Sequence, residues 1–320
     1  MMNKVVVLNE TFLRDKHLNK LQKLVEVEMY AGTESLEEAQ KRLKGADIAV
    51  IDSFVLPLGE EFFRSCSHLD LVVINSTGYD KVDLQAAGKY GVQVANTPDF
   101  SSDSVAELNV ALIFSLARKL LILDSKFREN PAKPDCDPFN PQMSPLFGVE
   151  IAGKILGTIG FGNIGKSLAK KAKALGMKVL ASSRTSQKSE IATFVDLQTL
   201  LKESDFVTIN TPLTPQTKGM IGQEELEMMK ESAYLINTAR AGIVDSIALT
   251  QALQKGKIAG AGLEVIEALP PEHPLLRLEN VVFSWHSGSL TQEASKKNLP
   301  DIVVQTIIAF VNGRPINLLT

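Results

Sequence analysis

The stretch of sequence that decides the fold reads Ile155-Leu-Gly-Thr-Ile-Gly160-Phe-Gly162-Asn-Ile-Gly165-Lys-Ser-Leu-Ala169. An apolar strand leads into the pattern GxGxxG, and an amphipathic helix follows it. Gly160 permits a tight turn, Gly162 lets the backbone approach a pyrophosphate, and Gly165 lets the helix pack on the strand. The N-terminus of such a helix attracts phosphate. This context predicts a dinucleotide site formed by Gly160, Phe161, Gly162, Asn163, Ile164 and Gly165.

The end of the next strand indicates which dinucleotide is bound. NAD-binding proteins place Asp or Glu on the ribose hydroxyls about twenty residues after the glycines. Here the strand ends in Ser183-Arg184-Thr185, without a carboxylate. Two hydroxyls and a planar cation suit the 2′-phosphate of NADP, so we predict that NADPH is preferred over NADH. A solvated surface arginine is the alternative interpretation of Arg184.

The whole chain has the pattern of an α/β protein with two doubly wound parallel sheets. Its 320 residues exceed the size of one hydrophobic core, and short β-rich runs alternate with helix-like segments. A helix over 102–128 and a proline-containing loop over 130–145 separate two sets of strands, and a last helix covers 291–312. The expected strands are 5–8, 48–51, 71–74, 92–95, 155–159, 178–181, 206–209, 234–236, 260–263 and 281–283.

Composition narrows the classes of function. A formal charge of -3 with 22% charged residues lacks the basic excess of nucleic-acid-binding proteins. Cys66 and Cys136 lie far apart and have no metal-ligand spacing, which indicates neither a zinc site nor a disulfide framework and favours the cytoplasm. Residues 1–8 lack the features of a signal peptide. The apolar stretch 104–123 is interrupted by Glu107, Arg118 and Lys119, and the 10 uncharged residues between Glu107 and Arg118 fall short of the ~20 needed for a membrane span. We therefore expect small-molecule chemistry, with no nucleic acid and no membrane.

Three downstream segments point to a family. They are Asn237-Thr-Ala-Arg240-Ala-Gly-Ile-Val-Asp245, Glu264-Val-Ile-Glu267-Ala-Leu-Pro-Pro-Glu-His-Pro and Ser284-Trp-His286-Ser-Gly288. In this order, with the glycine motif upstream, the sequence resembles the D-isomer-specific 2-hydroxyacid dehydrogenases, and among them members of the glyoxylate/hydroxypyruvate reductase type. The similarity extends over nearly the whole chain and includes Ser76-Thr-Gly-Tyr-Asp80, Asn96-Thr-Pro98 and Thr211-Pro-Leu-Thr214.

The resemblance implies a role for each of several residues. His286 matches the general acid that protonates the keto oxygen, and Arg240 matches the arginine that polarises this oxygen and holds the substrate carboxylate. Backbone amides around Thr77 and Gly78 match the carboxylate-binding loop. Further cofactor contacts are expected from Thr211, Pro212, Thr238, Ala239, Glu264 and His286. The substrate pocket is expected to involve Phe54, Ser76, Thr77, Gly78, Arg240 and Trp285, with Val55, Phe100 and Met143 nearby.

The carboxylate that partners His286 is the point of departure from the family. Counting forward from Glu264, which stands where the family usually has Asp, the position of the catalytic glutamate falls on Leu269. Counting backward from His273-Pro-Leu-Leu276 places it on Glu267, with a two-residue deletion before it. A deletion in a loop costs little, whereas loss of the carboxylate would lower the pKa of the histidine and weaken the proton donor. We predict that Glu267, together with Arg240 and His286, is catalytic.

The resemblance implies a discontinuous substrate-binding domain of flavodoxin-like type, residues 1–100 and 289–320, and a Rossmann NAD(P)-binding domain, residues 101–288. It further implies a homodimer formed through the nucleotide domain. The predicted reaction is NADPH-dependent reduction of a small 2-oxo acid, with glyoxylate, hydroxypyruvate and pyruvate-like acids all open and no metal required. The alternatives are a non-catalytic NAD(P)H-sensing regulator of the same fold and a formate- or phosphite-type dehydrogenase.

Overall fold

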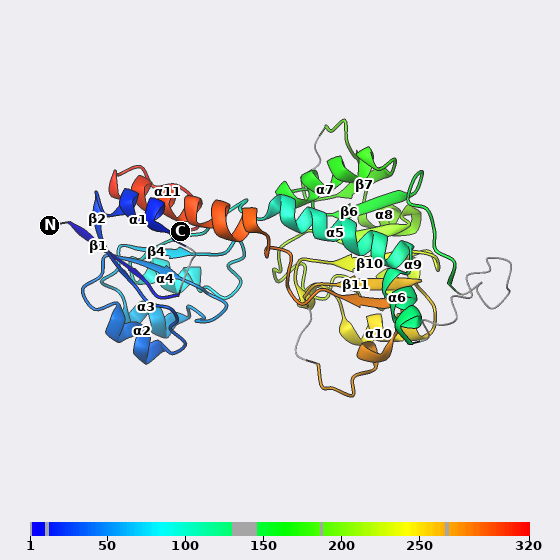
Figure 1. The fold of residues 1–320 in the computed structure, drawn as a ribbon, viewed down its shortest axis with the longest axis horizontal. Coiled ribbons are helices and arrows are strands. Elements are labelled where there is room, and N and C mark those ends of the chain that lie inside the picture. Colours follow the sequence, from blue (N-terminus) through cyan, green and yellow to red (C-terminus); the bar gives the residue numbers. More distant parts are fainter. Residues whose placement is uncertain (1, 10–12, 130–145, 186–187, 266–268) are drawn as a thin grey trace. The chain divides into compact units, whose positions relative to one another are not determined.

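A computed structural model describes residues 2–9, 13–129, 146–185, 188–265 and 269–320 (Figure 1). The chain divides into two compact units, Met1–Ser101 with Ser289–Thr320, and Ser102–Gly288. Within the described ranges, none of the helices is long and apolar enough to cross a membrane.

Unit 1 is a five-stranded parallel sheet in the order β2-β1-β3-β4-β5. This order is that of flavodoxin-like folds. Its elements are β1 (Asn3–Val7), α1 (Asp15–Leu21), β2 (Val25–Met29), α2 (Leu36–Arg42), β3 (Ile48–Ile51), α3 (Glu60–Ser65), β4 (Leu71–Ile74), α4 (Leu84–Lys89), β5 (Gln93–Ala95), a π-helical turn η4 (Ala294–Asn298) and α11 (Leu299–Val311).

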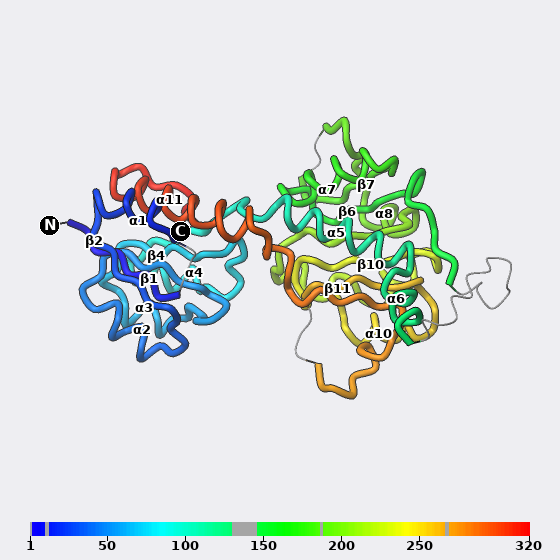
Figure 2. The backbone as a smooth tube through the Cα atoms, in the orientation of Figure 1, coloured from blue at the N-terminus to red at the C-terminus, as the bar shows by residue number. Residues whose placement is uncertain are grey.

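Both faces of this sheet are covered, which explains why β3 and β4 are apolar at every position. Helices α2, α3 and α4 pack on one face through residues such as Leu43, Phe62 and Phe63. Helices α1 and α11 pack on the other through residues such as Leu21 and Val303. Figure 2 shows the C-terminal helix α11 beside α1, close to the first strands of the chain. The C-terminal segment is therefore an integral part of the unit that the N-terminus begins.

Unit 2 is a seven-stranded sheet, all parallel, in the order β12-β11-β10-β9-β6-β7-β8. The chain switches sides between β6 and β9, the kind of point at which α/β sheets bind ligands. Its elements are α5 (Ser102–Ala117), α6 (Leu120–Glu129), β6 (Ile155–Ile159), α7 (Asn163–Ala174), β7 (Lys178–Ser182), β8 (Thr193–Phe194), α8 (Leu197–Glu203), β9 (Phe206–Ile209), α9 (Gln223–Met228), β10 (Tyr234–Asn237), a 3₁₀ turn η2 (Ala241–Ile243), α10 (Ser246–Gln254), β11 (Gly260–Leu263), a second 3₁₀ turn η3 (Pro274–Arg277) and β12 (Val281–Phe283).

Two hydrophobic clusters lie on the two faces of this sheet. Helices α5 and α7 pack against each other and cover one face (Figure 1). Helices α8, α9 and α10 cover the other. The two-layer covering expected for two doubly wound sheets is confirmed in both units.

Three expectations about single elements were wrong. The helix predicted over 102–128 is two helices, α5 and α6, because Lys119 adopts a left-handed conformation with φ 51° that ends α5. Strand β2 was missed, because its Val-Glu-Val-Glu-Met pattern lacks a continuous apolar run and it lies at the edge of the sheet. Strand β8 is only two residues long and was also missed. The proline-containing loop at 130–145 lies outside the described residues.

A buried histidine links α1 to α11 in unit 1. The side chain of His17 is fully buried; its Nδ1 accepts a hydrogen bond from the Arg14 backbone N–H at 3.1 Å, and its Nε2 lies 3.1 Å from Oδ1 of Asp301. With Nδ1 as acceptor, Nε2 carries the proton and donates to Asp301. Burial lowers the pKa of His17, against the raising effect of the Asp301 carboxylate. The folded protein therefore binds a proton at this site less readily than the unfolded chain does.

This difference in pKa predicts a loss of stability on acidification. A lowered folded pKa means that the unfolded chain gains the proton first, so stability falls as the pH drops through the ordinary imidazole value of about 6.5. We expect the urea midpoint of unmodified protein to fall between about pH 7.5 and about pH 5.5, and His17→Gln to show a smaller fall. The exposed His68, replaced by Gln, is the matched control and should retain the full fall. An identical pH dependence in the His17 and His68 variants would contradict this account.

Candidate active site

The glycine-rich turn joins β6 to α7 at the carboxyl edge of the unit 2 sheet. Gly160 has φ 96°, a left-handed conformation that favours glycine. A Cβ at Gly165 would collide with the carbonyl oxygen of Gly160, so only glycine lets α7 lie this close to the turn. Gly162 is the N-cap of α7; no side chain caps the helix there, and a Cβ on Gly162 would meet nothing within 4 Å. The first N–H groups of α7 therefore suit a bound phosphate.

A cavity of about 680 Å³ opens beside this turn. Its lining includes Gly160, Phe161 and Gly162, and also the predicted 2′-phosphate residues Ser183, Arg184 and Thr185. Arg184 is exposed and has no ion-pair partner within the described ranges, while Ser183 Oγ donates to the Thr185 carbonyl at 2.7 Å. The complete lining is Ile159, Gly160, Phe161, Gly162, Lys166, Ser182, Ser183, Arg184, Thr185, Leu197, Asn210, Thr211, Pro212, Thr214, Gln216, Thr217 and Met220.

Some predicted cofactor residues lie elsewhere or contribute differently. Asn163, Ile164 and Gly165 belong to the first turn of α7, next to the cavity but outside its lining. The side chain of Phe161 is buried and packs edge to face on Phe194, with ring centroids 5.1 Å apart, so only its backbone can contact a cofactor. Thr238, Ala239, Glu264 and His286 follow other strands and do not line this cavity.

Asn210 is a cavity residue that the sequence analysis missed. Its Nδ2 donates to Thr158 Oγ1 at 3.0 Å and to Thr208 Oγ1 at 3.1 Å, because both hydroxyls donate in turn to carbonyl oxygens. Its Oδ1 is buried and has no hydrogen-bond partner among the described residues. A polar residue directly after the buried strand β9 was the available signal. Lys166, a cation directly after the third glycine, was likewise overlooked.

Three neighbouring strands, β10, β11 and β12, carry the residues expected to perform the chemistry. Because these strands are parallel, the loops after them emerge at the same edge of the sheet. Arg240 follows β10, Glu264 follows β11 directly, and His286 follows β12. A cation for a developing oxyanion and an imidazole for proton transfer are the groups that ketone reduction requires. Among the described residues there is no cluster of three or more His, Cys, Asp or Glu side chains that could hold a metal ion.

Hydrogen bonds to Asn237, the last residue of β10, hold the loop that carries Arg240. Asn237 Nδ2 donates to the Arg240 carbonyl at 2.9 Å, and Asn237 Oδ1 accepts from the Ala239 N–H at 3.1 Å. One residue earlier, Thr238 Oγ1 accepts from Asn109 Nδ2 of α5 at 2.8 Å. Asn109 is fully buried, and the other buried residues of α5 are apolar, so this polar residue was the signal that could have revealed the contact.

Glu264 is buried, with 4% of its surface exposed. Its Oε1 accepts a hydrogen bond from the Gly288 N–H at 2.7 Å, and its carbonyl accepts from the His286 N–H at 2.9 Å. Burial raises the pKa of the Glu264 carboxyl, whereas the Gly288 hydrogen bond and the charge of Arg240 lower it. Glu264 is therefore a buried acid and not a surface residue.

Trp285 and His286 have φ values of 49° and 53°. Two successive non-glycine residues in the left-handed region cost on the order of 1–3 kcal/mol each, and such conformations occur mostly at functional sites. Both residues are exposed, Trp285 almost fully at 96%. The His286 ring is therefore presented at the surface of unit 2 on a backbone that its surroundings must hold.

The two candidate partners of His286 differ in what the structure describes. Glu267 and its neighbours 266 and 268 lie outside the described residues. Leu269 is half-buried and packs against the hydrophobic cluster that α8, α9 and α10 form on the sheet. The side chain of Leu269 thus contributes to the core of unit 2.

The loop after β4 in unit 1 contains the predicted carboxylate-binding residues. Ser76 Oγ donates to the Gly78 carbonyl at 2.7 Å, and Thr77 Oγ1 donates to the Thr97 carbonyl at 3.0 Å. Asn96 Nδ2 donates to the Thr77 carbonyl at 2.9 Å. Within the part of the chain that is described, the Thr77 and Gly78 N–H groups donate no hydrogen bond. Phe54, after β3, and Phe100 belong to the same unit; Met143 lies outside the described residues.

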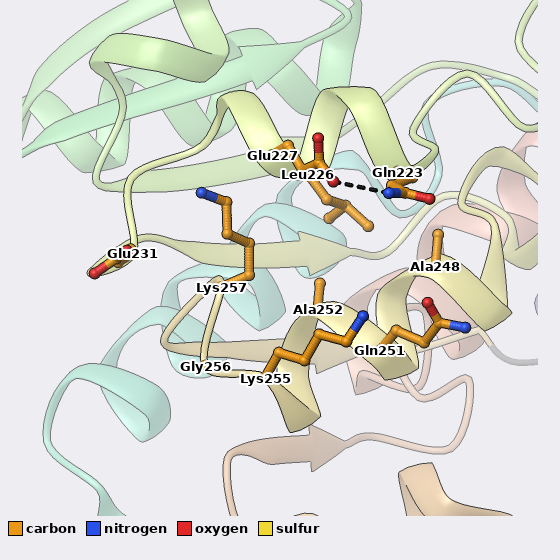
Figure 3. A pocket seen from close by; sticks show the side chains of 10 residues that line it. All are labelled: Gln223, Leu226, Glu227, Glu231, Ala248, Gln251, Ala252, Lys255, Gly256 and Lys257. Carbon is orange, nitrogen blue, oxygen red and sulfur yellow. Dashed lines mark hydrogen bonds between the residues drawn. The ribbon is translucent and has the colours of Figure 1, made fainter.

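A second hollow, of about 460 Å³, lies between α9 and α10 (Figure 3). Its walls are long surface side chains such as Lys255, Glu227 and Gln251, and a hydrogen bond between Gln223 and Glu227 spans one turn of α9. It contains none of the predicted site residues. Its exposed, mixed charges are typical of a solvated groove.

Comparison with known proteins identifies the family. The model of the D-isomer specific 2-hydroxyacid dehydrogenase NAD-binding domain matches residues 110–288. A glyoxylate reductase of Thermococcus litoralis is 38% identical over 308 residues, covering 94% of this chain and 92% of the relative. A glycerate dehydrogenase of Methylorubrum extorquens is 39% identical and covers 99% of both chains.

Solved structures agree with this similarity. An acyclic imino acid reductase in complex with NADPH and D-Arg has a TM-score of 0.90, 29% identity and coverage of 99% of this chain and 100% of that chain. With two parallel-sheet units, a glycine-rich turn at the switch point of the second, and Arg240 and His286 after its neighbouring strands, the chain belongs to the D-isomer specific 2-hydroxyacid dehydrogenases, the NAD(P)-dependent enzymes that interconvert 2-oxo and 2-hydroxy acids.

Proposed function

We propose that this enzyme uses NADPH in preference to NADH to reduce a small 2-oxo acid, of the size of glyoxylate, hydroxypyruvate or pyruvate, to the D-2-hydroxy acid. The observation that carries the proposal is the set of loops after β10, β11 and β12, which present a cation and an imidazole at one edge of the sheet that also bears the glycine-rich turn. The names of the two relatives, glyoxylate reductase and glycerate dehydrogenase, support the substrate class.

The residues of unit 2 divide the chemistry between them. The nicotinamide, when bound, supplies the hydride to the keto carbon. Arg240 polarises the keto oxygen and pairs with the substrate carboxylate, and His286 donates the proton to this oxygen. Glu267 is the proposed carboxylate that keeps His286 protonated near neutral pH. The first turn of α7, with Asn163, Ile164 and Gly165, holds the pyrophosphate, while Thr211, Pro212, Thr238, Ala239 and Glu264 contribute further cofactor contacts.

In unit 1 we assign the substrate carboxylate to the backbone N–H groups of Thr77 and Gly78. These groups have no acceptor within the described part of the chain, and their loop is fixed by Asn96 and Thr97. Phe54 and Ser76 are proposed substrate contacts of unit 1, and Trp285 is a proposed substrate contact of unit 2.

The function is tested by following NADPH absorbance against a panel of glyoxylate, hydroxypyruvate, pyruvate and longer 2-oxo acids. We expect turnover of the small acids, and a strong loss of kcat/KM in Arg240→Lys, because lysine keeps the charge but loses the planar fork that holds two oxygens. The exposed Lys255→Ala serves as a control and should retain activity.

Three results would contradict the proposal. Tight NADPH binding without reduction of any 2-oxo acid would indicate a regulator. Oxidation of formate or phosphite in place of 2-oxo acid reduction would indicate the other dehydrogenase type. Near-normal turnover in Arg240→Lys would show that the arginine has a structural role only.

The preference for NADPH depends on Arg184. This side chain is exposed and lines the cofactor cavity beside Ser183 and Thr185, where a 2′-phosphate would lie. Removing a charge-assisted hydrogen bond costs roughly 1.5 to 3 kcal/mol, so Arg184→Ala should weaken NADPH binding about 10- to 150-fold. NADH binding should stay the same, because NADH has no phosphate at this position.

A second variant separates phosphate recognition from general damage to the site. Gly165→Ala introduces a Cβ that collides with the Gly160 carbonyl oxygen, so it should weaken NADH and NADPH alike. Calorimetric titration of both variants with both cofactors makes the comparison. Equal affinity of the unmodified enzyme for NADH and NADPH would refute the preference.

We further propose that the enzyme is a cytoplasmic homodimer that associates through unit 2. Helix α6 has no buried residue, although its sequence begins Leu120-Leu-Ile-Leu123 and includes Phe127. Leu120, Leu121 and Phe127 are each more than half exposed, and Phe147 nearby in sequence is 56% exposed. Exposed apolar surface concentrated on one helix is typical of a protein–protein interface.

Sedimentation velocity tests this interface. Phe127→Glu should shift the unmodified dimer to monomer, because a charge would be buried without a partner in the interface. The control Leu24→Glu, at an exposed apolar position of unit 1, should remain dimeric. A monomeric unmodified protein, or a dimeric Phe127 variant, would refute the assignment.

A further inference from the structure

The loop Ser284–Gly288 determines where the proton donor lies, and its conformation is unfavourable by itself. Trp285 and His286 are both left-handed, at φ 49° and 53°. A side chain in this region clashes with its own backbone, so the conformation persists only where neighbouring groups hold it. The contacts around the loop therefore decide the orientation of the His286 ring.

One residue contacts the loop both within this left-handed pair and just after it. The Glu264 carbonyl accepts from the His286 N–H at 2.9 Å, and Glu264 Oε1 accepts from the Gly288 N–H at 2.7 Å. The far end of the loop has one more support, since Ser104 Oγ of α5 donates to the Gly288 carbonyl. At its near end, the Ser284 N–H donates to the Leu263 carbonyl at 3.1 Å.

Gly288 is matched to this carboxylate. A Cβ there would lie 2.5 Å from Glu264 Oε1 and 3.0 Å from its Cδ, so any larger residue would displace the carboxylate. Glu264 also lies within the field of Arg240, the positive charge of which acts on the same carboxyl group. A single buried acid is thereby connected to both loops that present the chemistry.

We propose that Glu264 is a positioning residue for His286: its carboxylate fixes the left-handed backbone at Trp285 and His286 and so sets the direction from which the imidazole donates its proton. This inference rests on the proposed function, in which His286 is the proton donor. The Glu264 side chain is also expected to contact the cofactor, and the positioning role is a second role of the same side chain. Aspartate, one methylene shorter, cannot reach Gly288 from the same backbone position, whereas glutamine can still accept the hydrogen bond.

The experiment compares Glu264→Ala, Glu264→Asp and Glu264→Gln with the unmodified enzyme. Misplacement of a catalytic group by about 1 Å lowers rates by about 100-fold, so Ala and Asp should lower kcat about 10- to 100-fold even at saturating NADPH, a loss that a change in the Kd of NADPH does not explain. Gln should restore most of kcat. The exposed Glu279→Ala, just before β12, is the matched control and should leave both parameters unchanged.

A second measurement follows the loop without using activity. Trp285 is the only tryptophan of the chain, so fluorescence excited selectively at tryptophan reports on this loop alone. Time-resolved anisotropy should gain a fast component in the Ala and Asp variants, and Gln and the Glu279 control should match the unmodified protein. Unfolding midpoints identify any variant that fails to fold. If Glu264→Ala does not fold, the comparison of Glu264→Gln with Glu264→Asp tests the positioning role.

The outcomes separate the two proposals. Unaltered anisotropy in Glu264→Ala, or a rise in the Kd of NADPH that accounts for the lost activity, would overturn the positioning role and favour a cofactor contact. Absence of turnover in the unmodified protein, with the anisotropy change still present, would overturn the proposed function and leave Glu264 as the residue that fixes the loop.

Discussion

The parallel arrangement of β12-β11-β10-β9-β6-β7 is the constraint on which the rest of unit 2 depends. It sends the loop after each of these strands to the same edge of the sheet, so residues more than 120 positions apart in the sequence, such as Gly160 and His286, belong to one edge. The apolar strands that produce this arrangement are buried on both faces and contain few polar groups. Chemistry is therefore confined to the positions directly after the strands, where the backbone leaves the core.

Close packing at the glycine-rich turn is a second constraint, because it sets the distance between β6 and α7. Gly165 and Gly160 approach so closely that a single methyl group would separate α7 from β6. Moving the helix would also move its first N–H groups, which suit a bound phosphate. The fold and the cofactor site thus depend on the same two residues, and this is why the sequence motif is informative about both.

The strands of the interior could be predicted from sequence because their apolar runs have no other explanation, and the residues after them could be assigned from their motifs. The inward direction of the Glu264 side chain could not be predicted, because its hydrogen-bond partner Gly288 lies 24 residues later in the sequence. Gly288 is in turn held by Ser104, on the helix at the start of the unit. Asn109 and Asn210 were missed for the same reason: each contacts residues distant in sequence. The break between α5 and α6 at Lys119 could not be predicted either, because no proline or glycine lies there. Local sequence patterns therefore specify helices and strands, whereas a buried polar contact depends on a pair of residues that can lie far apart in the sequence.

Burial of Glu264 beside Arg240 has a consequence for the interpretation of any change at either residue. A buried carboxylate is unfavourable unless hydrogen bonds and opposite charge offset its desolvation, and here the Gly288 N–H and the Arg240 charge do so. Removing the cation entirely would raise the pKa of Glu264 further and weaken its hold on the His286 loop, in addition to any loss of substrate contact. The two effects are coupled and need not add. Retaining the charge as lysine isolates the contribution of the planar guanidinium, because the electrostatic support of Glu264 is then preserved.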